Sequence, residues 1–208
     1  MADLDRMHVL TSAPRIQRRE TRVQGLVLLA ILVALMWAVE MIDLAAGELD
    51  AYGIRPRVDE GLPGIVLAPF LHGSFGHLIG NTIPLVMLGA VIALGGLRRI
   101  AVVTLIVGLS AGIGTWLMAP VNTIHIGASG IVFGYISYLV VRGLYSRSAL
   151  HFAAGVLVFV FWGGTLLTGL VPEAGISWQG HLFGALGGIL AARLVHASNP
   201  RRRLSNRG

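Results

Sequence analysis

Six long apolar stretches follow one another along the chain, and short segments that carry most of the charged residues separate them. Each stretch is near the roughly 20 residues that a helix needs to cross about 30 Å of hydrocarbon. The stretches are residues 26–44, 75–96, 100–118, 129–141, 152–170 and 178–194. The pattern predicts an all-α membrane protein whose six-helix domain spans residues 24–197. Residues 1–23 and the Arg-rich residues 198–208 are expected to form mobile cytoplasmic tails.

The composition supports a membrane protein. Of the 208 residues, 55% are hydrophobic and 12% are charged, whereas soluble domains carry roughly 25% charged residues. The chain has no cysteine, which excludes disulfides and thiolate metal sites; we expect no metal and no cofactor. The net charge of +6 could indicate a nucleic-acid partner, but all 16 basic residues are arginines and most lie beside apolar stretches. The lipid bilayer is therefore the expected partner, not nucleic acid.

The arginines predict the orientation of the helices, because basic residues near span ends are retained on the cytoplasmic side. All but two of the 16 arginines fall in segments that six alternating spans place on one side of the membrane. The exceptions are Arg55 and Arg57, in the loop between the first two spans. Both termini are therefore expected in the cytoplasm. A cleaved signal peptide is a poorer interpretation of the first stretch, since its apolar run exceeds the roughly 7–15 residues of such peptides.

Unusual polar residues gather where three of the spans begin at the outer surface. The second span opens with His72, His77 and Asn81, the fourth with Ser129, and the sixth with His181. Polar groups at membrane depth are costly and usually mark function. Because a helix rises about 1.5 Å per residue, each of these side chains lies within one or two turns of the outer end. The topology thus predicts that they share one depth.

Ser129 is the candidate nucleophile. It lies in the motif Gly127-Ala128-Ser129-Gly130, where a loop enters the fourth span. A serine at this point could simply be an N-cap. A helix N-terminus also offers free backbone N–H groups and a positive dipole end, which would stabilise an oxyanion beside the serine.

His181 is the candidate base, although a histidine at a helix end can also be an ordinary interfacial residue. Gly180, Gly184 and Gly188 surround it at a spacing of four, and Gly130 and Gly134 repeat that spacing after Ser129. Small residues four apart allow transmembrane helices to approach closely. Such an approach is what a short serine side chain needs in order to reach a base on another helix. No acidic residue is obviously placed to orient His181, which favours a dyad over a triad.

Three other polar residues near the site have competing interpretations. Asn81 lies one turn beyond His77 on the same helix face, so both could stabilise an oxyanion or form structural hydrogen bonds between helices. For His72 we expect a structural hydrogen bond. His125, four residues before Ser129, is a weaker alternative to His181, because the residues between them are expected to form a loop.

The rhomboid intramembrane proteases are the family that this chain resembles, over about residues 64–195. The resemblance lies in the order and spacing of His72-x4-His77-x3-Asn81, Gly127-Ala128-Ser129-Gly130 and His181-x2-Gly184-x3-Gly188. It implies a six-helix rhomboid bundle with a Ser129–His181 dyad. It also implies an oxyanion hole formed by His77, Asn81 and the Ser129 backbone N–H, a loop shaped by Gly127, and an aromatic ring, Phe133, packed against the histidine.

The implied activity is that of a serine endopeptidase, which cleaves a transmembrane segment of a single-span membrane protein near the outer face through an acyl-enzyme. Entry of the substrate near the fifth span, with residues 171–177 as a lid, is implied as well. One alternative is a catalytically silent relative that binds membrane clients, although such relatives usually lack the serine or the histidine. Another is a small transporter or channel, which would need polar groups through the full depth, whereas the inner halves of these spans are nearly all apolar. The Arg-only basic residues favour a bacterial plasma membrane, and the sequence carries no signal for an oligomeric state.

Overall fold

Six long helices dominate the computed structural model, which describes residues 2–173 and 175–197. They match the six predicted stretches to within a few residues at most ends, apart from the start of the first. The helices are α1 (Ala2–Ala46), α3 (Phe75–Ala93), α4 (Leu97–Met118), α5 (Ser129–Ser146), α6 (Ala149–Thr168) and α7 (Trp178–Ala197). Helix α1 begins at Ala2, so the segment predicted to be a mobile N-terminal tail continues the first helix. The predicted tail at 198–208 lies outside the described residues.

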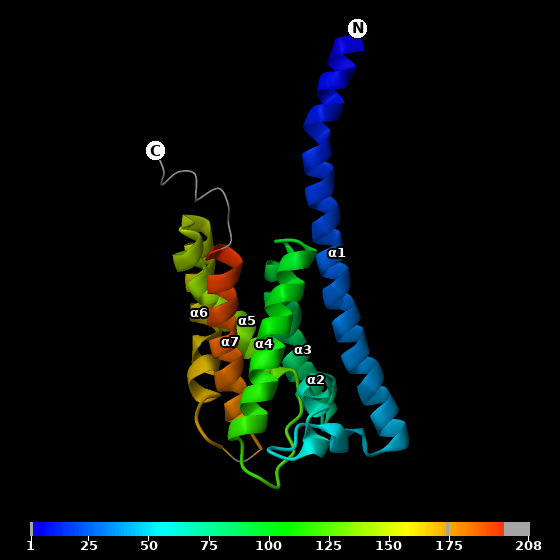
Figure 1. Cartoon of the computed structure of the whole chain (residues 1–208), viewed down its shortest axis with the longest axis vertical. Coiled ribbons are helices and arrows are strands. Elements are labelled where there is room, and N and C mark those ends of the chain that lie inside the picture. The colour runs from blue at the N-terminus through cyan, green and yellow to red at the C-terminus, as the bar shows by residue number, and fades with distance from the viewer. Residues whose placement is uncertain (1, 174, 198–208) are drawn as a thin grey trace.

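The helices run roughly along one axis, and the start of α1 and the end of α7 lie at the same end of the bundle (Figure 1). Helix α5 packs against α7 and α6, and α4 also packs against α7. On the other side of the bundle, α1 packs against α3 and α4. Helix α6 has α5 as its main neighbour. Helix α5 is therefore central, whereas α1 and α6 lie at the edges.

Helices α5 and α7 approach closely through their glycines. A Cβ atom added to Gly134 would lie 2.8 Å from the carbonyl oxygen of Gly184, and one added to Gly184 or Gly188 would meet the backbone of Gly130 or Gly134. Ser137 Oγ donates a hydrogen bond of 2.7 Å to the Ala185 carbonyl across the same contact. The small residues predicted to permit this approach therefore lie at the contact itself.

The six long helices differ in how apolar they are. Helices α1, α3, α4 and α6 are long and apolar enough to cross a membrane, and α6 exposes large apolar side chains such as Phe159, Val160 and Phe161. Helices α5 and α7 do not meet that criterion among the described residues. Most of α5 is buried against other helices, so protein and not lipid surrounds its polar residues.

Buried polar residues also occur at the end of α5 that is far from Ser129. Tyr138 and Arg142 are buried there, and His196 on α7 lies beside Tyr138. Arg142 and His196 lie just beyond the predicted spans 129–141 and 178–194, so Tyr138 is the member of this group that falls within a predicted span. The sequence pattern does not reveal that the fold gathers these single polar residues.

The segment 47–74 closes the end of the bundle at which α5 begins (Figure 1). It consists of the short helices η1 (Leu49–Tyr52), η2 (Asp59–Gly61), α2 (Gly64–Leu67) and η3 (Ala68–Phe70). Ile54 and His125 exchange two backbone hydrogen bonds of 2.9 and 3.0 Å, which attach this segment to the loop that precedes Ser129. The segment thereby fixes the entry of the chain into α5.

Candidate active site

Ser129 is the first residue of α5, and its hydroxyl points toward His181. Ala128 occupies the N-cap position and makes no side-chain cap, so Ser129 does not serve as the N-cap. Its Oγ lies 2.9 Å from His181 Nε2, within the range of a nucleophile and its base. The structure therefore brings together the two residues singled out as nucleophile and base, 52 positions apart in the chain.

A backbone carbonyl orients the His181 ring. His181 Nδ1 lies 2.7 Å from the carbonyl oxygen of Gly169, the C-cap residue of α6. Because a carbonyl only accepts hydrogen bonds, Nδ1 carries the proton, and the lone pair of Nε2 faces Ser129. That tautomer is the one that a general base needs. The carbonyl occupies the place that a carboxylate holds in a triad.

The Phe133 ring packs against one face of the His181 ring. It stacks on the His181 ring with centroids 4.0 Å apart and planes 6° from parallel. Phe133 lies one turn after Ser129 and is buried. A Cβ atom on Gly169 would run into the Phe133 ring, so the glycine allows ring and carbonyl to contact the histidine together. Sequence reasoning missed Gly169, since a backbone carbonyl leaves no signal in residue types.

Asn81 and His77 lie beside the turn that leads into Ser129. Gly127 in that turn has φ +105°, a conformation that favours glycine. A Cβ atom there would lie 2.6 Å from the His77 ring and 3.4 Å from Asn81 Nδ2. Asn81 is 5% exposed, and its Nδ2 has no hydrogen-bond partner among the described residues. The site thus contains a buried amide donor without an acceptor.

A large cavity connects these groups. Its volume is about 1000 Å³, and its lining includes Ser129, His181, His77 and Asn81. The loops before α5 and α7 contribute the rest of the wall. Ser129, His181 and the unpartnered Asn81 amide therefore share one space that is large enough for a peptide segment.

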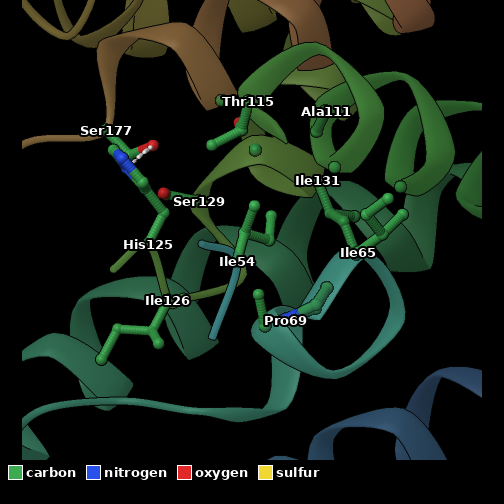
Figure 2. A pocket seen from close by; sticks show the side chains of 16 residues that line it. Ile54, Ile65, Pro69, Ala111, Thr115, His125, Ile126, Ser129, Ile131 and Ser177 are labelled. Atoms are coloured by element: carbon green, nitrogen blue, oxygen red, sulfur yellow. Dashed lines mark hydrogen bonds between the residues drawn. The ribbon is translucent and has the colours of Figure 1, made fainter. Parts of the chain in front are cut away.

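His125 has a different role from His181. Its Nδ1 lies 2.8 Å from Ser177 Oγ (Figure 2), and its Nε2 lies 2.8 Å from Thr123 Oγ1. Burial lowers the pKa of His125. Both ring nitrogens are thus engaged away from Ser129, and the residue connects the loop before α5 to the loop before α7. A small cavity of about 30 Å³ next to Ser129 is lined by residues of these loops and of α4.

His72 is buried next to His77 without the expected structural hydrogen bond. It is 1% exposed, and neither ring nitrogen has a hydrogen-bond partner among the described residues. Its ring lies edge-on to His77, with centroids 5.0 Å apart. Burial lowers the pKa of His72 to about 4, repulsion from His77 adds to this fall, and the Phe70 carbonyl offsets part of it. His72 is therefore a neutral packing residue at pH 7.

The remaining glycines of the predicted site lie at the contact between helices. A Cβ atom on Gly130 would lie 2.9 Å from Ala111 Cβ and 3.1 Å from the Gly180 carbonyl oxygen. Gly184 and Gly188 follow on α7 at successive turns below His181. They bring the backbones of α5 and α7 close enough for the Ser129–His181 hydrogen bond.

Comparison with known proteins gives a consistent result. The model of the Rhomboid domain matches residues 60–198. The uncharacterized protein Rv1337 of Mycobacterium tuberculosis is 41% identical over 207 residues, which is 95% of this chain and 86% of that protein. The uncharacterized protein ML1171 of Mycobacterium leprae is 41% identical over 89% of this chain and 77% of its own length.

A more distant relative carries a functional name. YdcA of Bacillus subtilis, named as a candidate rhomboid protease, is 26% identical over 133 residues, or 64% of this chain and 66% of its own. The family match covers well over half of the chain and includes all the residues of the site described above. The chain therefore belongs to the rhomboid family, a family of proteases, and is an integral membrane protein.

Proposed function

We propose that the protein is an intramembrane serine endopeptidase in which Ser129 is the nucleophile and His181 the base. The observation that carries this proposal is the 2.9 Å contact between Ser129 Oγ and His181 Nε2, with the tautomer set by the Gly169 carbonyl. A serine that has an oriented base and lies at a helix N-terminus has what acyl transfer requires. Membership of a protease family supports the same reaction.

The reaction follows from this geometry. Ser129 Oγ attacks the scissile carbonyl carbon while its proton passes to His181 Nε2. The oxyanion forms beside Asn81 Nδ2, His77 and the Ser129 backbone N–H, which stabilise its charge. His181 then gives the proton to the leaving amine, and an acyl ester remains on Ser129. His181 then takes a proton from water, which attacks the ester carbonyl carbon. The bond to Ser129 Oγ breaks, His181 returns the proton to Ser129 Oγ, and the new carboxyl group is released.

The proposed topology has six spans with both termini in the cytoplasm. The positions of the arginines support it, as does the arrangement in which α1 starts and α7 ends at one end of the bundle (Figure 1). Ser129 then lies near the outer face of a bacterial plasma membrane. Residues 24–197 form the protease domain, and the substrates are transmembrane segments of single-span proteins.

Labelling with a fluorophosphonate probe tests the chemistry. We expect the folded full-length protein to react with the probe, and Ser129→Ala and His181→Ala to lose the reaction. Ser177→Ala is the matched control, because Ser177 also faces the cavity but is hydrogen-bonded to His125; it should label like the wild type. Labelling that survives in Ser129→Ala would overturn the proposal.

Cleavage of a reconstituted single-span substrate tests the oxyanion hole. Removing one such donor lowers kcat by about 10²- to 10³-fold, so we expect a loss of this size in Asn81→Ala. The buried Nδ2 makes no hydrogen bond to the part of the chain that the structure describes, and its removal should leave thermal stability unchanged. A variant that unfolds at a lower temperature but keeps its kcat would assign Asn81 a structural role instead.

The two alternative functions predict different results. A silent client-binding protein would bind a single-span peptide but show no Ser129-dependent labelling. A transporter would need a polar path along the bundle, but the buried middle of α5 is mostly apolar, and the buried Ser137 hydroxyl is already hydrogen-bonded to the Gly134 and Ala185 carbonyls. Both alternatives are therefore less well supported than the protease.

A further inference from the structure

A second buried polar cluster lies at the end of the bundle opposite Ser129. Its central residue is Arg142, 13 positions after Ser129 on α5 and so about 20 Å away along the helix. Arg142 is only 6% exposed. Its electrostatic neighbours are Tyr138 and Arg99, and no described carboxylate acts on it. A guanidinium is thus buried beside a second arginine without an anionic partner.

Several polar atoms of this cluster have no hydrogen-bond partner among the described residues. These atoms are the Tyr138 hydroxyl, Arg142 Nε and His196 Nε2; the Tyr138 hydroxyl lies close enough to the Arg142 guanidinium to interact with it electrostatically. His151 completes the group, with its ring 6.1 Å from that of His196 and its Nδ1 2.8 Å from Ser146 Oγ. Buried polar groups are usually satisfied, so such a concentration of unsatisfied ones points to an absent ligand.

The four cationic or imidazole groups come from four different helices. Arg99 lies in the first turn of α4, Arg142 on α5, His151 in the first turn of α6 and His196 in the last turn of α7. Arg99 acts electrostatically on Arg142, His151 and His196, so the four groups lie within range of one another. The close packing of Gly143 against the backbone of Phe152 holds α5 and α6 together beside them. All these features favour an anion.

We propose that this cluster, formed by Arg99, Arg142, His151 and His196, binds the phosphate group of an anionic phospholipid. Arg142 and Arg99 match phosphate oxygens, because a guanidinium donates several hydrogen bonds in one plane. The cluster lies at the end of the membrane-spanning helices, where headgroups are found, and basic pockets between such helices bind anionic headgroups. The lipid phosphate supplies the negative charge that a buried guanidinium requires.

Lipid retention in nanodiscs tests the proposal with a closely matched pair of variants. Arg99 is half-buried and faces the cluster, whereas its neighbour Arg98 is exposed. The full chain is reconstituted in an equal mixture of phosphatidylcholine and phosphatidylglycerol, and bound lipid is measured by native mass spectrometry. We expect Arg99→Gln to weaken retention of phosphatidylglycerol about tenfold or more, as the loss of a charge-assisted hydrogen bond implies. Arg98→Gln should retain the lipid like the wild type.

Additional variants and a phosphate control separate a specific lipid site from general surface charge and from a soluble-anion site. Arg142→Gln should also lose the lipid. If Arg142→Gln does not fold, His151→Gln replaces it and should likewise weaken retention of phosphatidylglycerol. Ser129→Ala should bind the lipid normally, since this site is independent of the proposed protease. Equal losses in Arg98→Gln and Arg99→Gln would overturn the proposal, because they would reflect general surface charge. Stabilisation of the detergent-solubilised protein by inorganic phosphate, without selective lipid retention, would also overturn it and assign the site to a soluble anion.

Discussion

At the scale of single residues, His181 is held by two groups that carry no charge. The Gly169 carbonyl accepts its Nδ1 proton, and the Phe133 ring stacks on its face. A buried carboxylate in this place would have to lose its hydration, which is costly in an apolar environment. A carbonyl fixes the same tautomer without that penalty. In the proposed enzyme, the base would thus be oriented by a backbone carbonyl and a hydrocarbon ring alone.

The contact between Gly169, Phe133 and His181 predicts a large effect of a single methyl group. In Gly169→Ala the new Cβ would collide with the Phe133 ring, so that either the ring or the carbonyl must move. Because misplacement by about 1 Å can lower a rate 10²-fold, we expect kcat to fall roughly ten- to a hundredfold. Cleavage of a reconstituted substrate measures the change.

Gly164→Ala is the control for this substitution. Gly164 lies on α6 as well, and a Cβ atom there would meet nothing within 4 Å, so the variant should retain normal activity. Equal kcat values for the two variants would show that the Gly169 carbonyl does not position the base.

Residue types with chemical function could be predicted from the sequence, but their partners could not. Ser129, His181 and Asn81 stood out because polar side chains are rare in apolar spans. The backbone carbonyl of Gly169 is not encoded by any residue type. The hydrogen bond expected of His72 is not found among the described residues, and its ring packs edge-on to His77 instead. Both errors concern contacts that residue types alone do not reveal.

At the scale of helices, the approach of α5 to α7 determines whether the serine and the histidine can meet. Gly184→Ala would place a Cβ atom against the backbone of Gly130, one residue after Ser129. Backbone cannot yield as a side chain does, and overpacking a tight contact typically costs about 1–3 kcal/mol. We expect a lower unfolding temperature and loss of labelling at Ser129, measured by thermal denaturation and by the fluorophosphonate probe.

The same substitution at Gly164 again provides a control, since it adds a methyl group to a helix without any contact. A Gly184→Ala variant that labelled and unfolded like Gly164→Ala would contradict the role of the α5–α7 contact.

The positions of the long helices were predictable because apolar length alone defines them. Apolarity was less informative for α5 and α7, which fall short of the hydropathy of a typical span. The short helices between residues 47 and 74 were not predicted. They depend on long-range contacts such as the hydrogen bonds between Ile54 and His125, which no local pattern indicates.

At the scale of the whole molecule, polar groups gather at both ends of the bundle, and a mostly apolar layer separates them. His72 belongs to the end that contains Ser129 and is buried within the 47–74 segment beside His77 of α3. Its burial couples protonation to unfolding of the bundle, because the charged ring is stable only when exposed to water.

This coupling predicts a dependence of stability on pH. The pKa of His72 falls from an ordinary value of 6.5 to about 4 in the folded protein, so the unfolded chain binds the proton more tightly. The contribution of neutral His72 to the free energy of unfolding is complete above pH 6.5 and is lost as the pH falls from 6.5 towards 4. The free energy of unfolding falls by at most roughly 3 kcal/mol through this group. Thermal unfolding of the wild type should therefore shift to lower temperature across this window.

His72→Leu removes the titrating group and keeps an apolar side chain in the buried site. Its unfolding temperature should fall less between pH 6.5 and 4 than that of the wild type, and the difference between the two curves isolates His72. Parallel curves would show that His72 is not the titrating group.

The position of Gly169 at the end of α6 has a consequence for regulation. Helix α6 has one main protein neighbour, α5, and its other faces expose large apolar side chains. Its position therefore depends on the contact with α5 and on the surrounding lipid. A displacement of α6 away from α5 would draw the Gly169 carbonyl from His181 and release the imidazole. In the proposed enzyme, bilayer mechanics would thus act directly on the basicity available to Ser129.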